Sequence, residues 1–340
     1  MALQSTDVII IGAGPVGLFA IFECGMMRLR CCVIDALDIP GGQCAALYPE
    51  KPIYDIPAHP KILGGELIDQ LKCQAAPFKP VYYLGQQVLK LEKNANDLWQ
   101  IETSLGQQIE AKAVLIAAGV GAFGPNRPPL EHLESFEEKS VFYYVKNRED
   151  FRGKNLVIAG GGDSAVDWAL SLAEIAKKVT VVHRRSKFRA APESEAKLQT
   201  LAKAGKIDLV VPFQLESLAG QDGVLERVTV KSFEGETREI QAEFLLPFYG
   251  LAMDLGPIAQ WGLQLNTSHI QIDPKDCSTN IPGIYAIGDI AYYPHKLKLI
   301  LTGFAEAAHA AYAIRSFVHP GEMYHFEYST TSGVPAIGAA

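Results

Sequence analysis

The stretch 8-VIIIGAGPVG-17 decides the first part of the fold. Its apolar run Val8–Ile11 is typical of a buried strand, and glycines follow at positions 12, 14 and 17. Pro15 suits the first turn of a helix, where its missing N–H costs no hydrogen bond. A second apolar run, Cys31–Ile34, ends at Asp35. We therefore predict a strand–turn–helix–strand unit of about 30 residues, the usual length of a βαβ crossover.

This glycine spacing predicts a dinucleotide site. Gly12 would supply the tight turn, Gly14 the close approach of the backbone to a pyrophosphate, and Gly17 the close packing of helix on strand. The N–H groups and the dipole of the helix N-terminus would hold the negative charge. Asp35, eighteen residues after Gly17, would accept hydrogen bonds from the ribose hydroxyls.

A second copy of the unit follows after residue 154. Its apolar run Asn155–Ala159 leads to a second glycine loop, with a helix expected to about Lys177 and a strand at Val179–Val182. The second strand ends not in an acid but in basic residues, which would bind a 2′-phosphate, so this site should prefer NADP to NAD. We expect Asp163 to cap the helix. The predicted NADP residues are Gly160, Gly162, Asp163, Ser164, Ala165, His183, Arg184, Arg185 and Arg189.

Alternating segments after each unit predict β-meanders. In the first half we expect strands at Val81–Leu91, Leu98–Thr103 and Gln108–Glu110, with the meander ending in Ala113–Ile116. In the second half we expect strands at Leu209–Leu218, Leu225–Phe233 and Thr237–Ala242. Ile284–Asp289 reads as a buried strand with a Gly turn whose carboxylate, Asp289, would hold the ribityl chain of an FAD. A helix is expected from about Gly303 to Val318.

The predicted fold class is α/β, with two Rossmann-like, three-layer ββα dinucleotide-binding domains. The NADP domain, 120–248, is expected to be inserted in the FAD domain, 1–119 and 249–318. Linkers at Gly119–Gly124 and Gly250 would serve as hinges. Residues 319–340 would form a loop-like C-terminal tail.

Composition excludes several classes of protein. The 340 residues carry 31 Lys+Arg and 38 Asp+Glu, a net charge of −7, which argues against non-specific nucleic-acid binding. The apolar segment 8–27 holds too many glycines for a membrane span and follows no basic region. We therefore expect no membrane association. The six cysteines show no metal-ligand spacing and no C-x-x-C, so we expect incidental thiols, no metal and a cytoplasmic location.

The order of the motifs GAGPVG, GGGDSA, HRR and AIGD resembles the flavoprotein reductases of the thioredoxin reductase branch. Those enzymes carry a redox-active C-x-x-C near the NADP unit, whereas residues 142–151 here read FYYVKNREDF and no cysteine occurs from 74 to 276. The chain is more similar to the thioredoxin-reductase-like ferredoxin–NADP⁺ reductases of bacteria, which lack the dithiol. The carrying segments are Gly41–Cys44, Leu47–Lys51, Ile53–Asp55, Thr302–Ala307 and Tyr328–Thr331.

The resemblance implies roles for particular residues. Tyr48 would stack on one face of the isoalloxazine, and Tyr328, from the tail of a partner subunit, would cover the other. It further implies a homodimer and, as electron partner, ferredoxin or flavodoxin, which Lys51, Lys61, Lys296 and Lys298 could dock. The FAD residues expected from motif and resemblance together are Gly12, Gly14, Pro15, Gly17, Asp35, Gln43, Tyr48, Val88, Phe123, Asp289, Tyr328 and Thr330.

The implied activity is electron transfer between NADP(H) and ferredoxin. Hydride would pass directly to flavin N5, so we assign no catalytic acid, base or nucleophile. Asp55 and Glu306 stand in family-like motifs without an assigned role. Three alternatives stay open: an NADPH-dependent reductase of a quinone, flavodoxin or metal chelate; a non-enzymatic FAD-binding redox sensor; and, less favoured, a monooxygenase.

Overall fold

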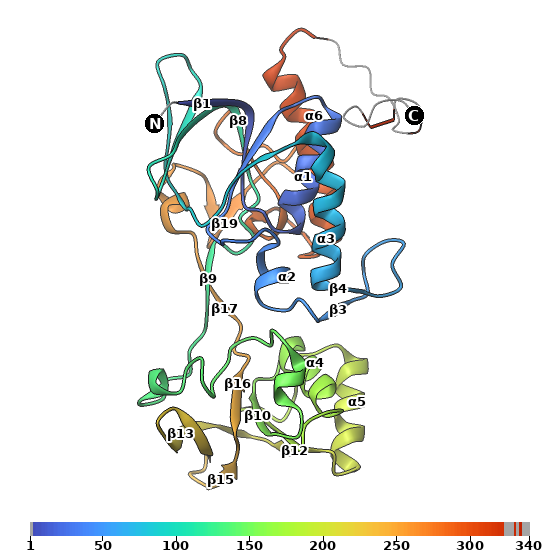
Figure 1. Ribbon diagram of the computed structural model, residues 1–340, viewed down its shortest axis with the longest axis vertical. Helices are drawn as coiled ribbons and strands as arrows, with labels where there is room; N and C mark the ends of the chain where they lie inside the picture. Colours follow the sequence, from blue (N-terminus) through green and yellow to red (C-terminus); the bar gives the residue numbers. More distant parts are fainter. Residues whose placement is uncertain (1–2, 323–329, 331–332, 335–340) are drawn as a thin grey trace. The chain divides into compact units, whose positions relative to one another are not determined.

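The computed structural model describes residues 3–322, 330 and 333–334. The chain divides into two compact units, and each is described by itself. Unit 1 comprises 1–123 and 253–340, and unit 2 comprises 124–252 (Figure 1). The connecting segments β9 (Ala122–Pro125) and β17 (Leu251–Asp254) pair with each other.

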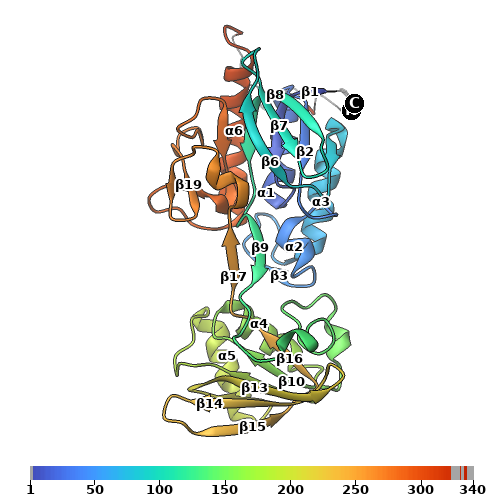
Figure 2. The same ribbon diagram turned by 90° about the vertical axis from the view of Figure 1, so that its left-hand side faces the viewer.

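Unit 1 is built on a seven-stranded sheet with β1 near its centre (Figure 2). The strand order is β5-β2-β1-β8-β7-β6, with β20 also pairing with β8. β1 is parallel to β2 and β8, with Val8 opposite Cys31 and Ala113. The bounds are β1 (Gln4–Ile11), β2 (Cys31–Ile34), β5 (Val81–Tyr83), β6 (Val88–Lys93), β7 (Trp99–Thr103), β8 (Gln108–Ile116) and β20 (Ile284–Ala286).

The central strands of unit 1 are apolar because both of their faces are covered. Val8 to Ile10 on β1 and Ala113 to Ile116 on β8 are completely buried. Helix α1 packs against both α3 and α6, and Phe19 and Phe304 meet at 4.8 Å between ring centroids. The helices are α1 (Pro15–Met26), α2 (Gly42–Ala46), α3 (Gly64–Ala75) and α6 (Ile300–Val318).

Smaller elements complete unit 1. It also contains a two-stranded sheet, a three-stranded sheet and short 3₁₀ turns. The bounds are η1 (Ala76–Phe78), β3 (Pro52–Ile53), β4 (Ile62–Leu63), η4 (Gly256–Gln260), β18 (Leu265–Asn266), β19 (His269–Gln271), η5 (Gly288–Ile290) and β21 (Ala291–Tyr292).

Three boundary predictions in unit 1 are wrong. The expected strand Val81–Leu91 is two strands, because the chain turns at Gly85 (φ +65°) and β5 joins β2 while β6 joins β7. The expected strands Gln108–Glu110 and Ala113–Ile116 form one strand, β8, which pairs with β7 at one end and β1 along its length. The last helix, α6, begins at Ile300 rather than near Gly303.

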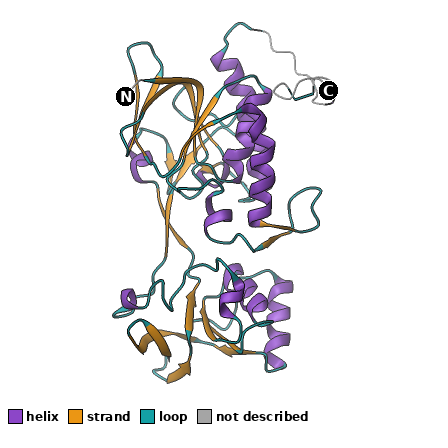
Figure 3. Cartoon of the chain, in the orientation of Figure 1, coloured by secondary structure: helices purple, strands orange, loops and turns teal. Residues whose placement is uncertain are grey.

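Unit 2 contains a four-stranded parallel sheet and a separate three-stranded antiparallel meander (Figure 3). The parallel order is β12-β11-β10-β16, and the meander order is β13-β14-β15. Its elements are η2 (Leu133–Ser135), η3 (Arg148–Phe151), β10 (Asn155–Ala159), α4 (Asp163–Leu172), β11 (Lys178–Val182), α5 (Pro192–Lys203), β12 (Ile207–Val210), β13 (Phe213–Gln221), β14 (Val224–Ser232), β15 (Thr237–Gln241) and β16 (Phe244–Pro247).

Unit 2 corrects two further boundaries. The expected strand Leu209–Leu218 is divided at Pro212 into β12, which belongs to the parallel sheet, and β13, which belongs to the meander. A proline lacks the N–H that a continuous central strand would need. Helix α4 ends at Leu172, five residues before the expected Lys177.

Membrane spans, metal clusters and cysteines bear on the class of protein. Among the described residues, no helix is long and apolar enough to cross a membrane. The same residues contain no group of three or more His, Cys, Asp or Glu side chains arranged to hold a metal ion. All six cysteines are free thiols, and only Cys73 is exposed.

Candidate functional site

The first glycine loop joins β1 to α1, and its three glycines have different environments. A Cβ on Gly12 (φ +108°) would lie 2.3 Å from the carbonyl oxygen of Ala117, and a Cβ on Gly17 would lie 2.0 Å from that of Gly12. Gly12 therefore makes the turn and Gly17 lets α1 approach the strand, as the spacing predicts. A Cβ on Gly14 would meet nothing closer than 4.0 Å. The fold itself does not require this glycine, which leaves room for a ligand.

Helix α1 starts with free donors facing this room. Gly14 is its N-cap, Pro15 occupies the first turn as predicted, and no side chain caps the helix. Unpaired N–H groups at a helix N-terminus attract anions. The loop is thus chemically suited to a pyrophosphate.

Asp35 directly follows β2 and binds the backbone of the same loop. Its carboxylate accepts hydrogen bonds from the backbone N–H groups of Ala13 (2.5 Å) and Leu37 (2.8 Å). Burial raises the pKa of this carboxyl, and the two hydrogen bonds oppose that rise. Asp35 also lines the cavity described next, where a ribose hydroxyl could donate to it.

A cavity of about 400 Å³ runs through unit 1 beside the glycine loop. Its walls bring together residues of β1, α1, β2, α2 and β6 with residues of the segments that follow β8 and β20, all far apart in the chain. The predicted FAD residues among them are Gly12, Gly14, Pro15, Asp35, Gln43, Tyr48, Val88 and Asp289. The cavity therefore joins an anion-binding end at α1 to an aromatic, carboxylate-bearing end at Tyr48 and Asp289.

Four predicted FAD residues are not among the cavity walls. Gly17 lies behind the loop, against Gly12. Thr330 is exposed. The side chain of Phe123 and all of Tyr328 lie outside the described residues.

Sequence reasoning missed other wall residues. They include Gln86, Ala118, Trp261, Lys298 and Leu299. Gln86 is buried, and its side-chain oxygen accepts a hydrogen bond from Thr103 (2.7 Å). Gln86 and Ala118 follow strands, Trp261 follows η4, and Lys298 and Leu299 directly precede α6. Neither spacing nor periodicity marks these positions. The only signal was position: ligand sites in open α/β sheets lie beyond the carboxyl ends of strands.

A buried ion pair, Lys296–Glu306, is hydrogen-bonded to the backbone of the Gly288–Asp289 turn. Glu306 on α6 is 6% exposed, and its Oε2 accepts from the backbone N–H of Gly288 (2.7 Å). The Lys296 ammonium lies 2.5 Å from Glu306 Oε1 and donates to the Gly288 carbonyl (2.7 Å). The Lys296 side chain is 5% exposed. The prediction of Lys296 as a surface docking residue is therefore wrong.

The second glycine loop, in unit 2, joins β10 to α4. Gly160 (φ +151°) makes the turn, since a Cβ there would lie 2.6 Å from the carbonyl oxygen of Phe248. A Cβ on Gly162 would meet nothing within 4 Å, so this glycine corresponds to Gly14. The N-cap is Gly162, not Asp163, whose carboxylate instead accepts from the backbone N–H of Ala191 (2.9 Å). Ala165 is completely buried.

A basic cluster follows β11 and lies next to this loop. The backbone N–H of Arg189 donates to the Gly161 carbonyl (2.6 Å). The His183 ring packs on Gly161 so closely that a Cβ added there would lie 2.3 Å from the ring. Arg184, Arg185 and Arg189 are exposed and form no ion pair with any described residue. Burial, and then the three arginine charges, lowers the pKa of His183. The guanidinium groups are available to an anion.

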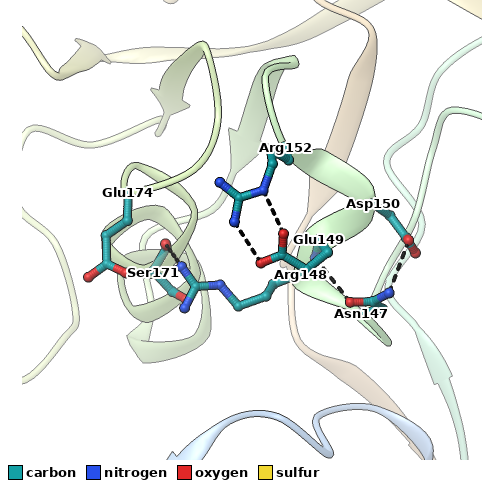
Figure 4. A network of polar contacts seen from close by, with 7 residues as sticks. All are labelled: Asn147, Arg148, Glu149, Asp150, Arg152, Ser171 and Glu174. Carbon is teal, nitrogen blue, oxygen red and sulfur yellow. Dashed lines mark hydrogen bonds and ion pairs between the residues drawn. The ribbon is translucent and has the colours of Figure 1, made fainter.

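The segment without cysteines, 142–151, is fixed by polar contacts inside unit 2 (Figure 4). The Asn147 side chain accepts from the backbone N–H of Glu149 (3.0 Å) and starts η3. Arg148 reaches the Ser171 carbonyl (3.0 Å) at the end of α4 and the Glu174 carboxylate (3.0 Å). Where the related enzymes carry a dithiol, this segment holds ion-paired side chains. Arg148 anchors it to helix α4.

Comparison with known families places the chain. Its residues 6–313 match the family described as pyridine nucleotide-disulphide oxidoreductase. The chain belongs to this family. Membership agrees with the two Rossmann-like domains predicted from the glycine loops and implies the use of a flavin and a pyridine nucleotide.

Individual relatives narrow the placement. A protein named ferredoxin–NADP reductase from Paramagnetospirillum magneticum is 61% identical over 335 residues, 98% of this chain and 99% of the relative. One of the same name from Rhodospirillum rubrum is 60% identical, covering 98% of each chain. The predicted resemblance to that group of oxidoreductases is confirmed.

Solved structures support the fold. Thioredoxin reductase from Lactococcus lactis is 27% identical, with a TM-score of 0.79 over 92% of this chain and 99% of that one. Thioredoxin reductase from T. acidophilum, 23% identical, has a TM-score of 0.80 over 92% and 98%.

Proposed function

We propose that this protein is an FAD-dependent reductase that transfers electrons between NADP(H) and ferredoxin without a redox-active dithiol. The cavity of unit 1 carries the proposal, because eight residues expected around FAD from the sequence converge on its walls. The unpaired arginines beside the second glycine loop support NADP(H) as the second nucleotide. The name shared by relatives at about 60% identity supports ferredoxin as the acceptor.

Residues of unit 1 would bind and orient the flavin cofactor. The N-terminus of α1 and Gly14 would hold the pyrophosphate, Asp35 the adenosine ribose and Asp289 the ribityl chain. Tyr48 would cover one face of the ring and exclude water. When bound, FAD supplies the chemistry: it takes a hydride at N5 and passes on single electrons. No protein acid or base is needed for that step.

Residues of unit 2 would select the coenzyme. The free N–H groups at the N-terminus of α4 would hold the pyrophosphate, with Gly162 leaving room for it. Arg184 and Arg185 would bind the 2′-phosphate that distinguishes NADP from NAD. We further propose, from the family resemblance, a cytoplasmic homodimer in which Tyr328 covers the partner's flavin.

The deciding experiment is an anaerobic absorbance titration. The purified protein should show a flavin spectrum that NADPH bleaches at least tenfold faster than NADH does. Addition of oxidised ferredoxin should then restore the flavin spectrum, faster at low than at high ionic strength. A protein without a flavin spectrum, or one that NADPH does not bleach, refutes the proposal. Recovery with a quinone or flavodoxin but not with ferredoxin supports the alternative acceptors.

A further inference from the structure

Glu306 is a buried carboxylate to which the proposed chemistry gives no task. It lies two turns into α6, in contact with the segment that carries Asp289. Its Oε2 binds the Gly288 N–H and its Oε1 the hydroxyl of Tyr293 (3.0 Å). Burying a charge is costly unless it is paired and hydrogen-bonded. Glu306 is paired with Lys296, and the presence of two buried charges at this place needs an explanation.

The ammonium of Lys296 completes a closed arrangement around one residue. It contacts Glu306, the Gly288 carbonyl and the face of the Tyr293 ring, whose centroid is 5.2 Å away. The two charged groups thereby occupy both the N–H and the C=O of Gly288. The next residue is Asp289, on the cavity wall.

The arrangement fixes one backbone conformation. Gly288 has a φ of +73°, and a Cβ there would lie 3.5 Å from Val16 on α1. That distance is an ordinary contact, whereas a Cβ on Gly303 of α6 would lie 2.3 Å from the Val16 side chain, so only Gly303 is restricted by Val16. The Gly288–Asp289 turn and helix α6 thus both contact α1 at Val16. A buried ion pair contributes little net stability compared with apolar packing, so its specific effect here is on the geometry of the turn.

We propose that Lys296 and Glu306 are positioning residues that hold the Gly288–Asp289 turn in its cofactor-binding shape. They also cancel each other's charge, so that no net charge from this pair lies behind the cavity. The inference rests on the proposed function, because it takes FAD as the ligand of the cavity.

The test compares purified holoprotein variants by FAD dissociation constant and by flavin midpoint potential. Glu306→Gln and Lys296→Met should each weaken FAD binding about tenfold or more, the loss of one hydrogen bond to a charged group. Reduction adds negative charge to the flavin, so the unpaired lysine left by Glu306→Gln should raise the potential, and the unpaired carboxylate left by Lys296→Met should lower it. The double variant should regain a potential near that of wild type while FAD binding stays weak.

A matched control exists in unit 2. Lys154 and Glu243 also form an ion pair (2.8 Å) in which the carboxylate accepts from a backbone N–H, that of Asn155, but their side chains are 43% and 41% exposed. Lys154→Met and Glu243→Gln should change FAD affinity less than twofold and leave the potential unchanged.

Either of two results in the single variants overturns the inference. One is FAD affinity within twofold of wild type in both single variants, and the other is a potential that shifts in the same direction in both. If neither single variant folds, Lys296→Arg decides: it keeps the charge but not the geometry of the Gly288 contact, so affinity should fall while the potential holds. Unchanged affinity in Lys296→Arg also overturns it. Wild-type protein that binds no FAD would refute the proposed function instead.

Discussion

Alanine at Gly14 should separate cofactor binding from folding. Gly14 has φ −67° and ψ −178°, which any residue adopts, and the nearest atom to a new Cβ would be 4.0 Å away. Lower entropy of the unfolded chain stabilises such a substitution by about 0.4–1 kcal/mol, whereas alanine is a poorer N-cap than glycine by a similar amount. The apoprotein of Gly14→Ala should therefore unfold within about 0.5 kcal/mol of wild type.

FAD binding should respond quite differently. If the pyrophosphate lies against Gly14, the new methyl group displaces it from the N–H groups of α1. Losing one hydrogen bond to a charged group costs about 1.5–3 kcal/mol, so the dissociation constant should rise about 10- to 150-fold. Urea unfolding of the apoproteins and fluorescence titration with FAD measure the two effects.

Gly17→Ala is the matched counterpart in the same loop. Its Cβ would lie 2.0 Å from the carbonyl oxygen of Gly12, a backbone atom that cannot move alone, so α1 must shift at an overpacking cost of about 1–3 kcal/mol. This apoprotein should be destabilised, in contrast to Gly14→Ala. FAD affinity within threefold of wild type in Gly14→Ala would refute the assignment of this loop to the pyrophosphate.

Three further predictions concern other parts of the chain. Arg184→Ala combined with Arg185→Ala should raise the KM for NADPH about tenfold or more while the KM for NADH stays unchanged, and equal effects on both coenzymes in steady-state kinetics would contradict the assignment. The pKa of His183 is lowered in the folded protein, so the unfolded chain binds this proton more readily. The free energy of unfolding should therefore fall as the pH drops below 6.5. His183→Asn should show a flatter pH dependence of that free energy. Leu115→Ala, at a completely buried site in β8, should cost about 2–5 kcal/mol, and a urea midpoint equal to that of wild type would disprove close packing there.

Local constraints explain which features the sequence could predict. The turn at Gly12 and the contact of Gly17 involve residues within a few positions of each other, so their spacing records the geometry directly. Alternation of apolar residues, by contrast, continues through Gly85 and hides the separation of β5 from β6. The pairing partner of each strand, β2 or β7, is a long-range choice that a local pattern does not carry.

Lys296 shows the same limit for a side chain. Its neighbours in sequence suggest a surface lysine, yet its partners are ten residues onward at Glu306 and eight residues back at Gly288. Only the packing of α6 against the turn buries it. Asp163 is similar, because its carboxylate binds Ala191, which the chain brings back after β11. The motif identifies Asp163 but no motif marks Lys296, and the partners of both residues depend on how distant segments pack.

The two glycine loops support a general criterion for the ligand-facing position. In each loop the fold itself requires some of the glycines: Gly12 and Gly17 in the first, Gly160 and Gly161 in the second, because a Cβ at any of them would overlap atoms of the protein. Gly14 and Gly162 meet no such obstacle, and both are the N-caps of the helices that follow. A glycine that the fold does not need, placed where free N–H groups begin a helix, is best explained by a ligand at contact distance. This reasoning applies to both loops, although they lie in different units and only the second stands beside a cluster of arginines. It therefore supports two nucleotide sites rather than one.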